Sequence, residues 1–350
     1  MALYDRIADL PLVVDGVEFD QRERDTSSGF TRVTTEIALH GEGATGRGED
    51  VTYDEDDQRS LPDVDLDLSG EYEFDEFSRT VGELDLFPTG PGREDFRDYR
   101  RWGFESAALD LALRQAGERL ADALDREPNA VRFVASTGLG DPPTTDRVER
   151  WLEHDPELEF KLDATPEWTD DLVADLADTG AVRVVDMKAQ YGDAEVNQRP
   201  DADLYRRVRD GLPDALVEDP AYTDETADVL DTARGRIAWD APIHGVESVE
   251  ALPFEPDWLN VKPSRFGSVA SLLETLEYCD RRDIRTYGGG QFELGVGRGQ
   301  IQLLAALFYP DAPNDVAPRA YNDPEPSPGL PSSPLDAPAP EDATGFRWER

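Results

Sequence analysis

The chain has 350 residues, enough for one large α/β barrel and an accessory domain. Its formal net charge is −42, from 77 acidic and 35 basic residues, which argues against nucleic acid or an anionic membrane as a partner. The acidic residues are spread along the whole chain, a pattern typical of halophilic proteins. No apolar run approaches the roughly 18 residues of a membrane span, and Met1–Leu10 lacks a signal-peptide pattern. We therefore expect a soluble, cytoplasmic protein.

The first part of the chain is predicted to be a meander of strands. Pro11–Asp20 and Arg32–Leu39 have strand-like composition, and Asp25–Phe30 between them is interpreted as a loop. The glycine-rich stretch Gly41–Gly48 lacks the Lys-Ser/Thr end of a phosphate-binding loop, so we interpret it as a hairpin turn. Asp54–Ser69 is acidic and has little periodicity, which indicates an exposed excursion.

A helix is then predicted over Gly103–Leu124, where apolar residues recur at helical spacing. We assign this helix to an N-terminal domain at residues 1–128. At the other end of the chain, Pro324–Pro340 holds seven prolines and is predicted to be extended. We place a C-terminal tail at residues 319–350 and expect it to pack back on the body through Gly345–Trp348.

Between these parts, residues 129–318 repeat a short apolar run, a loop and an amphipathic helix. Strands that alternate with helices indicate a parallel sheet, and seven or so such units in a row favour a closed (β/α) barrel. The predicted strands are Val131–Ser136, Glu159–Leu162, Val182–Val185, Ala215–Val217, Arg236–Trp239, Trp258–Val261 and Ile284–Tyr287. The predicted helices include Thr169–Ala177, Leu204–Leu212, Glu225–Ala233 and Ser268–Cys279.

Lysine is almost absent from this chain. Only three of the 35 basic residues are lysines, namely Lys161, Lys188 and Lys262, and each lies at the end of a predicted strand. Lysine can give up a proton when its surroundings lower its pKa, whereas arginine cannot. Strand ends form the catalytic face of a barrel, and residues two apart in a strand share a face, so Lys161 with Asp163 and Asp186 with Lys188 would point inward together. These positions favour function over chance retention of three lysines.

Carboxylates end neighbouring strands in the same way, at Asp186, Glu218 and Asp240. Three carboxylates are costly to bury together unless a cation lies among them. Ligands that are all oxygen suit Mg²⁺ or Mn²⁺ better than Zn²⁺. We therefore predict a divalent-metal site on these three residues, with lysines beside it for proton transfer. The alternative is a buried network of ion pairs without turnover.

Six short motifs in this order and spacing resemble the enolase superfamily, specifically its mandelate racemase and muconate lactonizing enzyme branch. The N-terminal stretches Arg32–Glu49 and Phe104–Leu113 are similar to the capping domain of that branch. The resemblance implies a modified (β/α)7β barrel of the TIM type with an N-terminal α+β capping domain, assembled into dimers or larger rings. The motifs are Phe160–Asp163 (FKLD), Val184–Lys188 (VVDMK), Leu216–Pro220 (LVEDP), Ile237–Asp240 (IAWD), Leu259–Gly267 (LNVKPSRFG) and Gly288–Gly295 (GGGQFELG).

The resemblance also implies a chemistry. Mg²⁺ would bind a substrate carboxylate and stabilise the enediolate formed when a base removes the α-proton. Lys262 matches the acid or base lysine of the sixth strand, and Lys161 matches the first lysine of the second-strand pair. The second lysine of that pair is replaced by Asp163, which breaks the usual pattern. Lys188 stands where the family commonly has asparagine, and it could supply the missing cation or pair with Asp163.

Substrate contacts are expected from the loops around this rim. The Ser27–Phe30 loop of the capping domain would close over the site. Arg265 could bind substrate or brace Asp163 or Glu293, and His244 lies in a strand-to-helix loop. The glycines after the seventh strand would let the backbone approach substrate, although a plain tight turn explains them as well. The candidate substrate-binding residues are Ser28, Phe30, His244, Asn260, Arg265, Gly289, Gln291 and Glu293.

The predicted function is a Mg²⁺-dependent enzyme that acts on a small-molecule carboxylate. Lyase chemistry, either dehydration or cycloisomerisation of the o-succinylbenzoate synthase kind, is favoured because the second-strand lysine pair is broken. An epimerase in which Lys188 replaces the lost lysine is the first alternative, and a non-catalytic metabolite-binding paralogue is the second. We expect a homo-oligomer.

Overall fold

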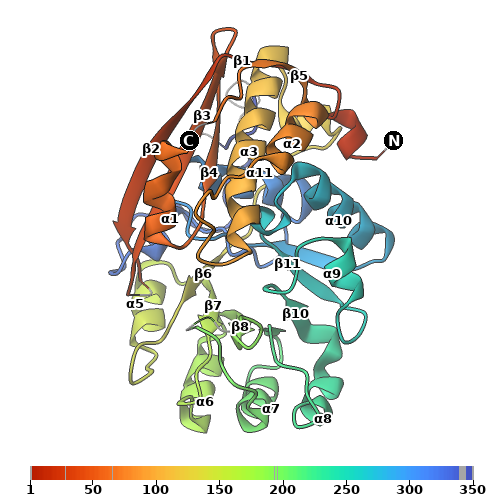
Figure 1. Cartoon of the computed structure of the whole chain (residues 1–350). Helices are drawn as coiled ribbons and strands as arrows, with labels where there is room; N and C mark the ends of the chain where they lie inside the picture. The colour runs from red at the N-terminus through yellow and green to blue at the C-terminus, as the bar shows by residue number, and fades with distance from the viewer. Residues whose placement is uncertain are drawn as a thin grey trace.

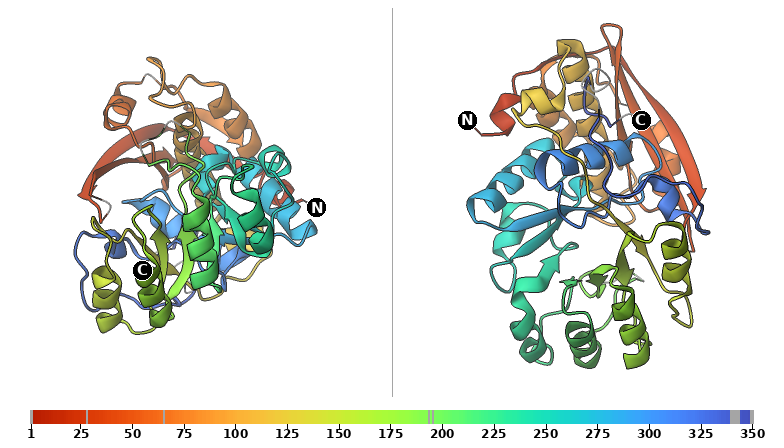
Figure 2. Two further views of the ribbon diagram at one scale, coloured as in Figure 1. Left: turned by 90° about the horizontal axis from the view of Figure 1, so that it is seen from below. Right: turned by 180° about the vertical axis from the view of Figure 1, so that it is seen from behind.

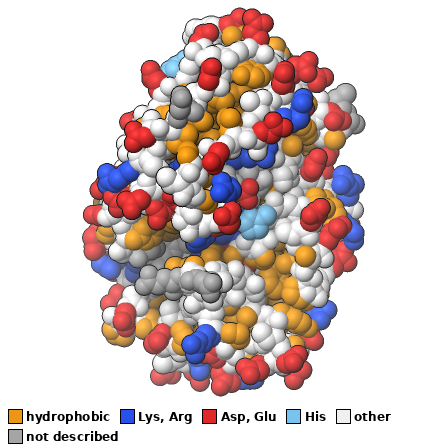
Figure 3. All heavy atoms as spheres, viewed as in Figure 1, with side chains coloured by type: hydrophobic (Ala, Val, Ile, Leu, Met, Phe, Trp, Pro, Cys, Tyr) orange, Lys and Arg blue, Asp and Glu red, His pale blue; other side chains and the backbone are white. Residues whose placement is uncertain are grey.

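The computed structural model describes residues 2–27, 29–64, 66–192, 194, 196–338 and 344–348. Figure 1 shows an N-terminal capping domain that lies over one end of a strand–helix barrel, and Figure 2 shows the same arrangement from below and from behind. Acidic side chains are scattered over both parts on the face in Figure 3, as the net charge requires. Among the described residues, no helix is both long and apolar enough to cross a membrane.

The capping domain is built on an antiparallel sheet of β2 (Gly16–Asp25), β3 (Thr31–Gly41) and β4 (Ala44–Asp50). A second antiparallel pair joins β1 (Pro11–Val14) and β5 (Gly70–Glu73). The remaining elements of this domain are η1 (Tyr4–Arg6), α1 (Glu55–Ser60), η2 (Leu61–Asp63), α2 (Phe74–Glu83), α3 (Phe96–Ala116) and α4 (Leu120–Ala123).

The interpretation of Gly41–Gly48 as a hairpin turn was wrong for most of its length. Only Glu42 and Gly43 turn the chain, with φ of 48° and 77°, and the glycines that follow belong to β4. They are needed because β4 packs directly on α3. A Cβ at Gly46 would lie 2.2 Å from the carbonyl oxygen of Ala107, and one at Gly48 would lie 2.0 Å from that of Gly103. Glycine here serves close packing between a strand and a helix.

Two other boundaries differ from the prediction. The long helix begins at Phe96 and ends before Gly117, whose φ of 70° stops it, so Leu120–Ala123 forms a separate short helix. The stretch predicted as an exposed excursion contains α1, which Asp54 caps by accepting a hydrogen bond from the backbone of Asp57. Gln58 of this helix is fully buried and accepts a hydrogen bond from Thr35 of β3.

The barrel prediction was correct. In the described part of the chain, seven strands form one parallel sheet in sequence order, and this sheet curls around a core. Parallel bridges join Asn314 to Phe133 and Asp315 to Gly289, so residues 314–315 link the two edges of the sheet. The strands are β6 (Val134–Thr137), β7 (Glu159–Asp163), β8 (Val182–Asp186), β9 (Leu216–Glu218), β10 (Ile237–Trp239), β11 (Trp258–Val261) and β12 (Arg285–Gly288).

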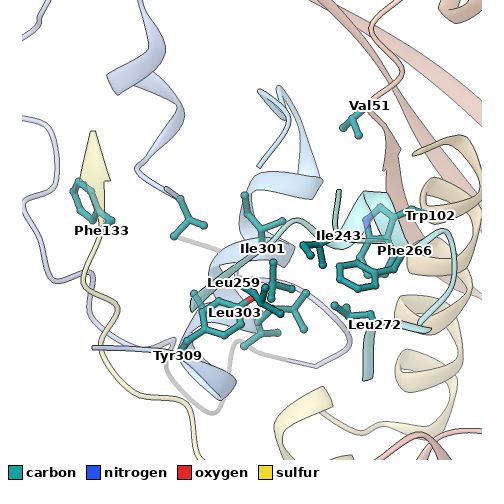
Figure 4. Packing of buried hydrophobic residues seen from close by; sticks show 14 of the residues in the cluster. Val51, Trp102, Phe133, Ile243, Leu259, Phe266, Leu272, Ile301, Leu303 and Tyr309 are labelled. Atoms are coloured by element: carbon teal, nitrogen blue, oxygen red, sulfur yellow. The ribbon is translucent and has the colours of Figure 1, made fainter. Parts of the chain in front are cut away.

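Helices follow the strands and cover the outside of the sheet (Figure 1). Their bounds are α5 (Asp146–His154), α6 (Asp170–Thr179), α7 (Ala202–Gly211), α8 (Ala227–Leu230), η3 (Asp231–Arg236), α9 (Val246–Glu250), η4 (Pro263–Phe266), α10 (Val269–Arg281), α11 (Val296–Phe308) and η5 (Arg319–Asn322). The main hydrophobic cluster runs without a break from the capping domain into the barrel. Figure 4 shows two parts of this cluster: Trp102 of α3 lies beside Phe266, and Leu259 of β11 lies near Leu303 of α11.

The C-terminal segment packs on both domains. Leu335 exchanges two backbone hydrogen bonds with Val131 at the start of the barrel, each 2.8 Å long. Phe346 is fully buried, and its ring meets that of Trp102 edge-on with centroids 6.3 Å apart. The tail therefore contributes to the core of the capping domain.

Candidate active site

A cavity of about 350 Å³ lies where the strand ends of the barrel face the capping domain. Residues from both domains line it. The capping domain contributes Phe30, Tyr53, Arg93 and Tyr99. All three lysines of the chain, Lys161, Lys188 and Lys262, line its barrel side. The positions predicted for proton transfer therefore line one cavity.

Two of the three predicted metal ligands lie together at the ends of neighbouring strands. Asp186 ends β8 and Glu218 ends β9, and both side chains are fully buried. With Asp219 they form a group whose carboxylate oxygens all lie within 4.8 Å of one another. Buried oxygen ligands at this spacing fit a divalent cation such as Mg²⁺.

Asp219 was not predicted. It follows β9 in the left-handed region, with φ of 48°. Its two carboxylate oxygens accept hydrogen bonds of 2.8 Å from the backbone of Asp240 and of Ala241. Asp219 thus ties the end of β9 to the end of β10.

Asp240, the third predicted ligand, is fully buried but lies outside the group of closely spaced carboxylates. Its carboxylate is held by three side chains instead. Lys262 Nζ lies 2.9 Å from Oδ2, Arg265 Nη1 lies 3.1 Å from Oδ1, and the hydroxyl of Tyr191 donates to Oδ2 at 3.0 Å. Burial opposes ionisation of Asp240, but Arg265 and Lys262 outweigh it and keep the pKa of this carboxyl well below its usual range.

Burial and mutual repulsion raise the pKa values of two of the clustered carboxylates. Burial raises the pKa of Glu218 to about 8, even though Lys161 lowers it, and the charges of Asp186 and Asp240 raise it further. Burial likewise raises the pKa of Asp219 to about 7, and Asp240 and Asp186 add to the rise. A bound divalent cation would relieve this repulsion, so the residues present fit a metal.

The three lysines differ in how many carboxylates hold them. Lys161 is buried, with Nζ 2.5 Å from Glu218, 3.6 Å from Asp315 and 3.7 Å from Asp186. Burial alone would lower its pKa, but these carboxylates raise it well above its usual value. The shared face predicted for Lys161 and Asp163 therefore does not make them partners.

Asp163 pairs with Lys188 instead, with Nζ 3.1 Å from its Oδ1. Lys188 also lies 2.5 Å from Oδ2 of Asp186. Burial would lower the pKa of Lys188, but Asp163 and Asp186 raise it well above its usual value. Of the two uses predicted for Lys188, the structure shows the ion pair with Asp163.

Some of the predicted substrate-binding residues line the cavity, namely Phe30, Arg265 and Gln291. The ring of Phe30 meets that of Phe292 edge-on, with centroids 5.4 Å apart. Gln291 accepts a hydrogen bond from Tyr53 at 2.9 Å. Arg265 braces Asp240, and neither of the partners predicted for it, Asp163 and Glu293, is paired with it. Ser28 lies outside the described residues.

The other predicted contacts act on the wall of the cavity and do not line it. Asn260 donates to Glu218 at 3.3 Å. A Cβ at Gly289 would lie 2.4 Å from Oδ1 of Asn260, so this glycine makes room for that side chain. Glu293 pairs with Arg298 at 3.2 Å, and His244 approaches the carbonyl oxygen of Arg265 at 3.1 Å.

Several cavity residues were missed because no strand-end pattern marks them. Tyr191 and Asp315 lie after β8 and α11, in segments without periodicity. Arg298 is in the first turn of α11. Tyr287 lies behind the cavity wall and donates to Glu218. Its place in β12, two residues before Gly289, is the only signal that could have pointed inward.

The chain resembles known enzymes in sequence and in structure. The chain is 23% identical over 224 residues to o-succinylbenzoate synthase of Bacillus subtilis, an alignment that covers 61% of this chain and 58% of that protein. The structure of a dipeptide epimerase from Methylococcus capsulatus, complexed with Mg ion, is 19% identical and has a TM-score of 0.66, with 87% of this chain and 89% of that chain covered. Muconate cycloisomerase from Pseudomonas fluorescens is 18% identical with a TM-score of 0.64, covering 87% of each chain.

These comparisons show the class of fold. The chain has the fold of structures from the enolase superfamily, among them a dipeptide epimerase and a muconate cycloisomerase. The chain belongs to the family described as "Domain of unknown function (DUF8230)". The N-terminal domain of that family matches residues 5–123, and its C-terminal domain matches residues 127–323.

Proposed function

We propose that the protein is a Mg²⁺-dependent lyase that removes the α-proton of a small carboxylate substrate, in the manner of o-succinylbenzoate synthase. The observation that carries the proposal is that Lys262 lines the same cavity as Lys161 and Lys188, beside the buried carboxylates of Asp186 and Glu218. The metal would be held by Asp186 and Glu218, with Asp219 or Asp240 as the third ligand. Bound there, Mg²⁺ supplies charge stabilisation as the α-carbon loses its proton.

Lys262 is the proposed general base. Among the described residues, its Nζ pairs with one carboxylate, Asp240, at 2.9 Å. Lys161 and Lys188 are each held by two or more carboxylates, which raise their pKa values and keep them cationic. A base must give up its own proton before it can accept another, so the lysine with the fewest acidic partners suits this role. Lys161 and Lys188 would instead stabilise negative charge.

Deuterium exchange tests the base directly. In D₂O with Mg²⁺, the wild-type protein should exchange the α-proton of a responsive acid found in a panel of small carboxylic acids. Lys262→Ala should abolish that exchange. Mg²⁺ should still raise the thermal midpoint of the variant, because binding to the folded state alone stabilises it. Arg234→Ala, on an exposed barrel arginine paired with Asp231, is the control. Exchange that survives in Lys262→Ala would overturn the assignment.

Metal binding is tested separately from activity. Glu218→Gln removes one ligand charge from the buried group and should abolish the thermal shift that Mg²⁺ produces in the wild-type protein. Glu118→Gln is a control, because this exposed side chain lies outside the cavity. An equal Mg²⁺ shift in Glu218→Gln and wild type would place the metal elsewhere.

An epimerase is the second candidate, because Lys188 and Lys262 both line the cavity and follow β8 and β11, which are separated by two strands of the sheet. Two lysines that reach substrate from different strands could each exchange the α-proton on one face. Solvent deuterium would then appear in both enantiomers, and Lys188→Met would abolish exchange of one enantiomer only. A lyase incorporates no label into a second enantiomer. Binding of metal and acid without any exchange would instead identify a non-catalytic paralogue.

A further inference from the structure

A second cavity, also of about 350 Å³, lies outside the candidate active site. Its walls come from the capping sheet, the start of α11, the short helix η5 and the C-terminal segment. Leu294, Gly295, Val296 and Gly299 form one side of it, whereas Gln291 and Arg298 of the same stretch line the first cavity. The two cavities thus share one wall segment, although no residue lines both.

The charge of this second cavity is opposite to that of the whole chain. Four arginines and a single acidic residue line it, in a protein with net charge −42. The acid, Glu36, is already shared between two of the arginines, with Arg22 at 3.0 Å and Arg47 at 2.7 Å. The third, Arg347, is 2.7 Å from Asp110. Arg22 also lies 3.4 Å from Asp20. Three of the four arginines are therefore paired with carboxylates.

The fourth arginine, Arg319, forms no ion pair with a carboxylate in the described part of the chain. It donates to the carbonyl oxygen of Leu294 at 2.7 Å, and the nearby carboxylate of Asp323 pairs with Arg24 instead. Burial lowers the pKa of Arg319, and the charges of Arg24 and Arg22 lower it further, while Asp323 opposes them. The Nε of Arg22 is a buried donor without a hydrogen-bond partner in the described part of the chain.

The backbone leaves the space open. A Cβ at Gly295 would lie 2.8 Å from Oε2 of Glu36 and 3.0 Å from Nε of Arg22, so a side chain here would press on the arginine cluster. Guanidinium groups bind phosphate through paired, charge-assisted hydrogen bonds. A phosphate carries close to two negative charges near neutral pH, which suits a cavity with several arginines and one acid.

We propose that this cavity binds a small phosphate-bearing anion, held by Arg319, Arg22 and Arg47. The ligand would contact β2, β4, η5 and the start of α11 at once, and it would brace the segment that also lines the candidate active site. The site is independent of the proposed lyase activity and is tested without it.

Calorimetric titration with inorganic phosphate, and then pyrophosphate, tests the proposal on the full-length protein in potassium gluconate, which avoids competition from chloride. We expect saturable binding that Arg319→Gln weakens by about tenfold or more, as expected for loss of a charged hydrogen-bond donor. Arg147→Gln is the matched control. Arg147 also donates to backbone carbonyls, at Asp323 and Pro324, but lies outside the cavity, and its loss should change affinity less than twofold.

Two further variants keep the result decisive. Arg22→Gln should also weaken phosphate binding, which guards against a folding defect peculiar to Arg319→Gln. Lys262→Ala, in the candidate active site, should leave phosphate binding unchanged. Absence of saturable binding, or binding lost in Lys262→Ala and kept in Arg319→Gln, would overturn the proposal.

Discussion

Replacing Glu49 with alanine should weaken the contact between the capping domain and the barrel and so lower the free energy of unfolding. Glu49 lies near the end of β4 and is 1% exposed. Its carboxylate accepts hydrogen bonds from three backbone N–H groups around the start of α11, at Leu294 (2.7 Å), Gly295 (2.9 Å) and Gly297 (2.9 Å). Gly297 lies in the first turn of α11, where N–H groups have no intrahelical partner, and Leu294 and Gly295 come just before the helix.

The magnitude follows from those three donors. A buried donor left without a partner costs about 1–3 kcal/mol, so the loss of all three acceptor contacts should reduce the free energy of unfolding by at least about 3 kcal/mol. Glu49→Gln retains one carbonyl oxygen as an acceptor and should cost less. The same segment carries Gln291, Phe292 and Arg298 of the candidate active site, so we also expect Glu49→Ala to weaken Mg²⁺-dependent ligand binding.

Urea unfolding at pH 7, followed by both tryptophan fluorescence and circular dichroism, measures the effect. Glu42→Ala is the control, because Glu42 is an exposed residue in the turn of the same hairpin. It should change stability by no more than about 0.5 kcal/mol. If Glu49→Ala unfolded within 1 kcal/mol of the wild type, the three hydrogen bonds would not hold the two domains together, and the reasoning would fail.

Three more outcomes are expected. Burial raises the pKa of Glu49 in the folded protein. The stability that Glu49 adds relative to Glu49→Gln is therefore complete below the unfolded pKa of about 4.3 and is lost as the pH rises through the folded pKa. Urea unfolding at pH 4 to 8 should show the difference in free energy of unfolding between the two proteins shrinking with pH, and a growing difference would contradict the sign. Gly48→Ala places a Cβ 2.0 Å from backbone and should cost about 1–3 kcal/mol or more, whereas Gly16→Ala, with nothing within 4 Å, should cost little. Burial raises the pKa of Cys279 to about 12, so this thiol should resist a disulfide reagent at pH 8 until urea unfolds the chain, and rapid labelling of the folded protein would refute its burial.

The barrel could be predicted from the sequence because its strands are buried on both faces. Most become short apolar runs, and Ile237–Trp239 and Trp258–Val261 stand out between polar helices. The capping domain was harder to predict. Gly46 and Gly48 look like turn residues, and only the contact with α3 shows why a strand needs them. A contact between distant segments leaves no local pattern in the sequence.

In the candidate site too, residues with a local sequence pattern were predicted, and contacts between distant residues mostly were not. Residues that end strands, such as Asp186, Glu218 and Lys262, were predicted because strand ends share one rim of a barrel. The pairing among them was predicted only in part, because it depends on where long side chains reach. Lys188 pairs with Asp186, as the two-residue spacing predicts, and with Asp163, as one of its two predicted uses has it. The pairing of Lys161 with Glu218 was not predicted. Asp315 was missed because residues 314–315 close the sheet through isolated bridges and carry no strand pattern.

The burial of Phe346 has a consequence for how the chain is synthesised. The strands of the capping domain leave the ribosome first, but the ring that completes their core against Trp102 is translated after the entire barrel. The core of the N-terminal domain is therefore completed only after residue 346 has left the ribosome. A product truncated before Phe346 would leave Trp102 without this contact.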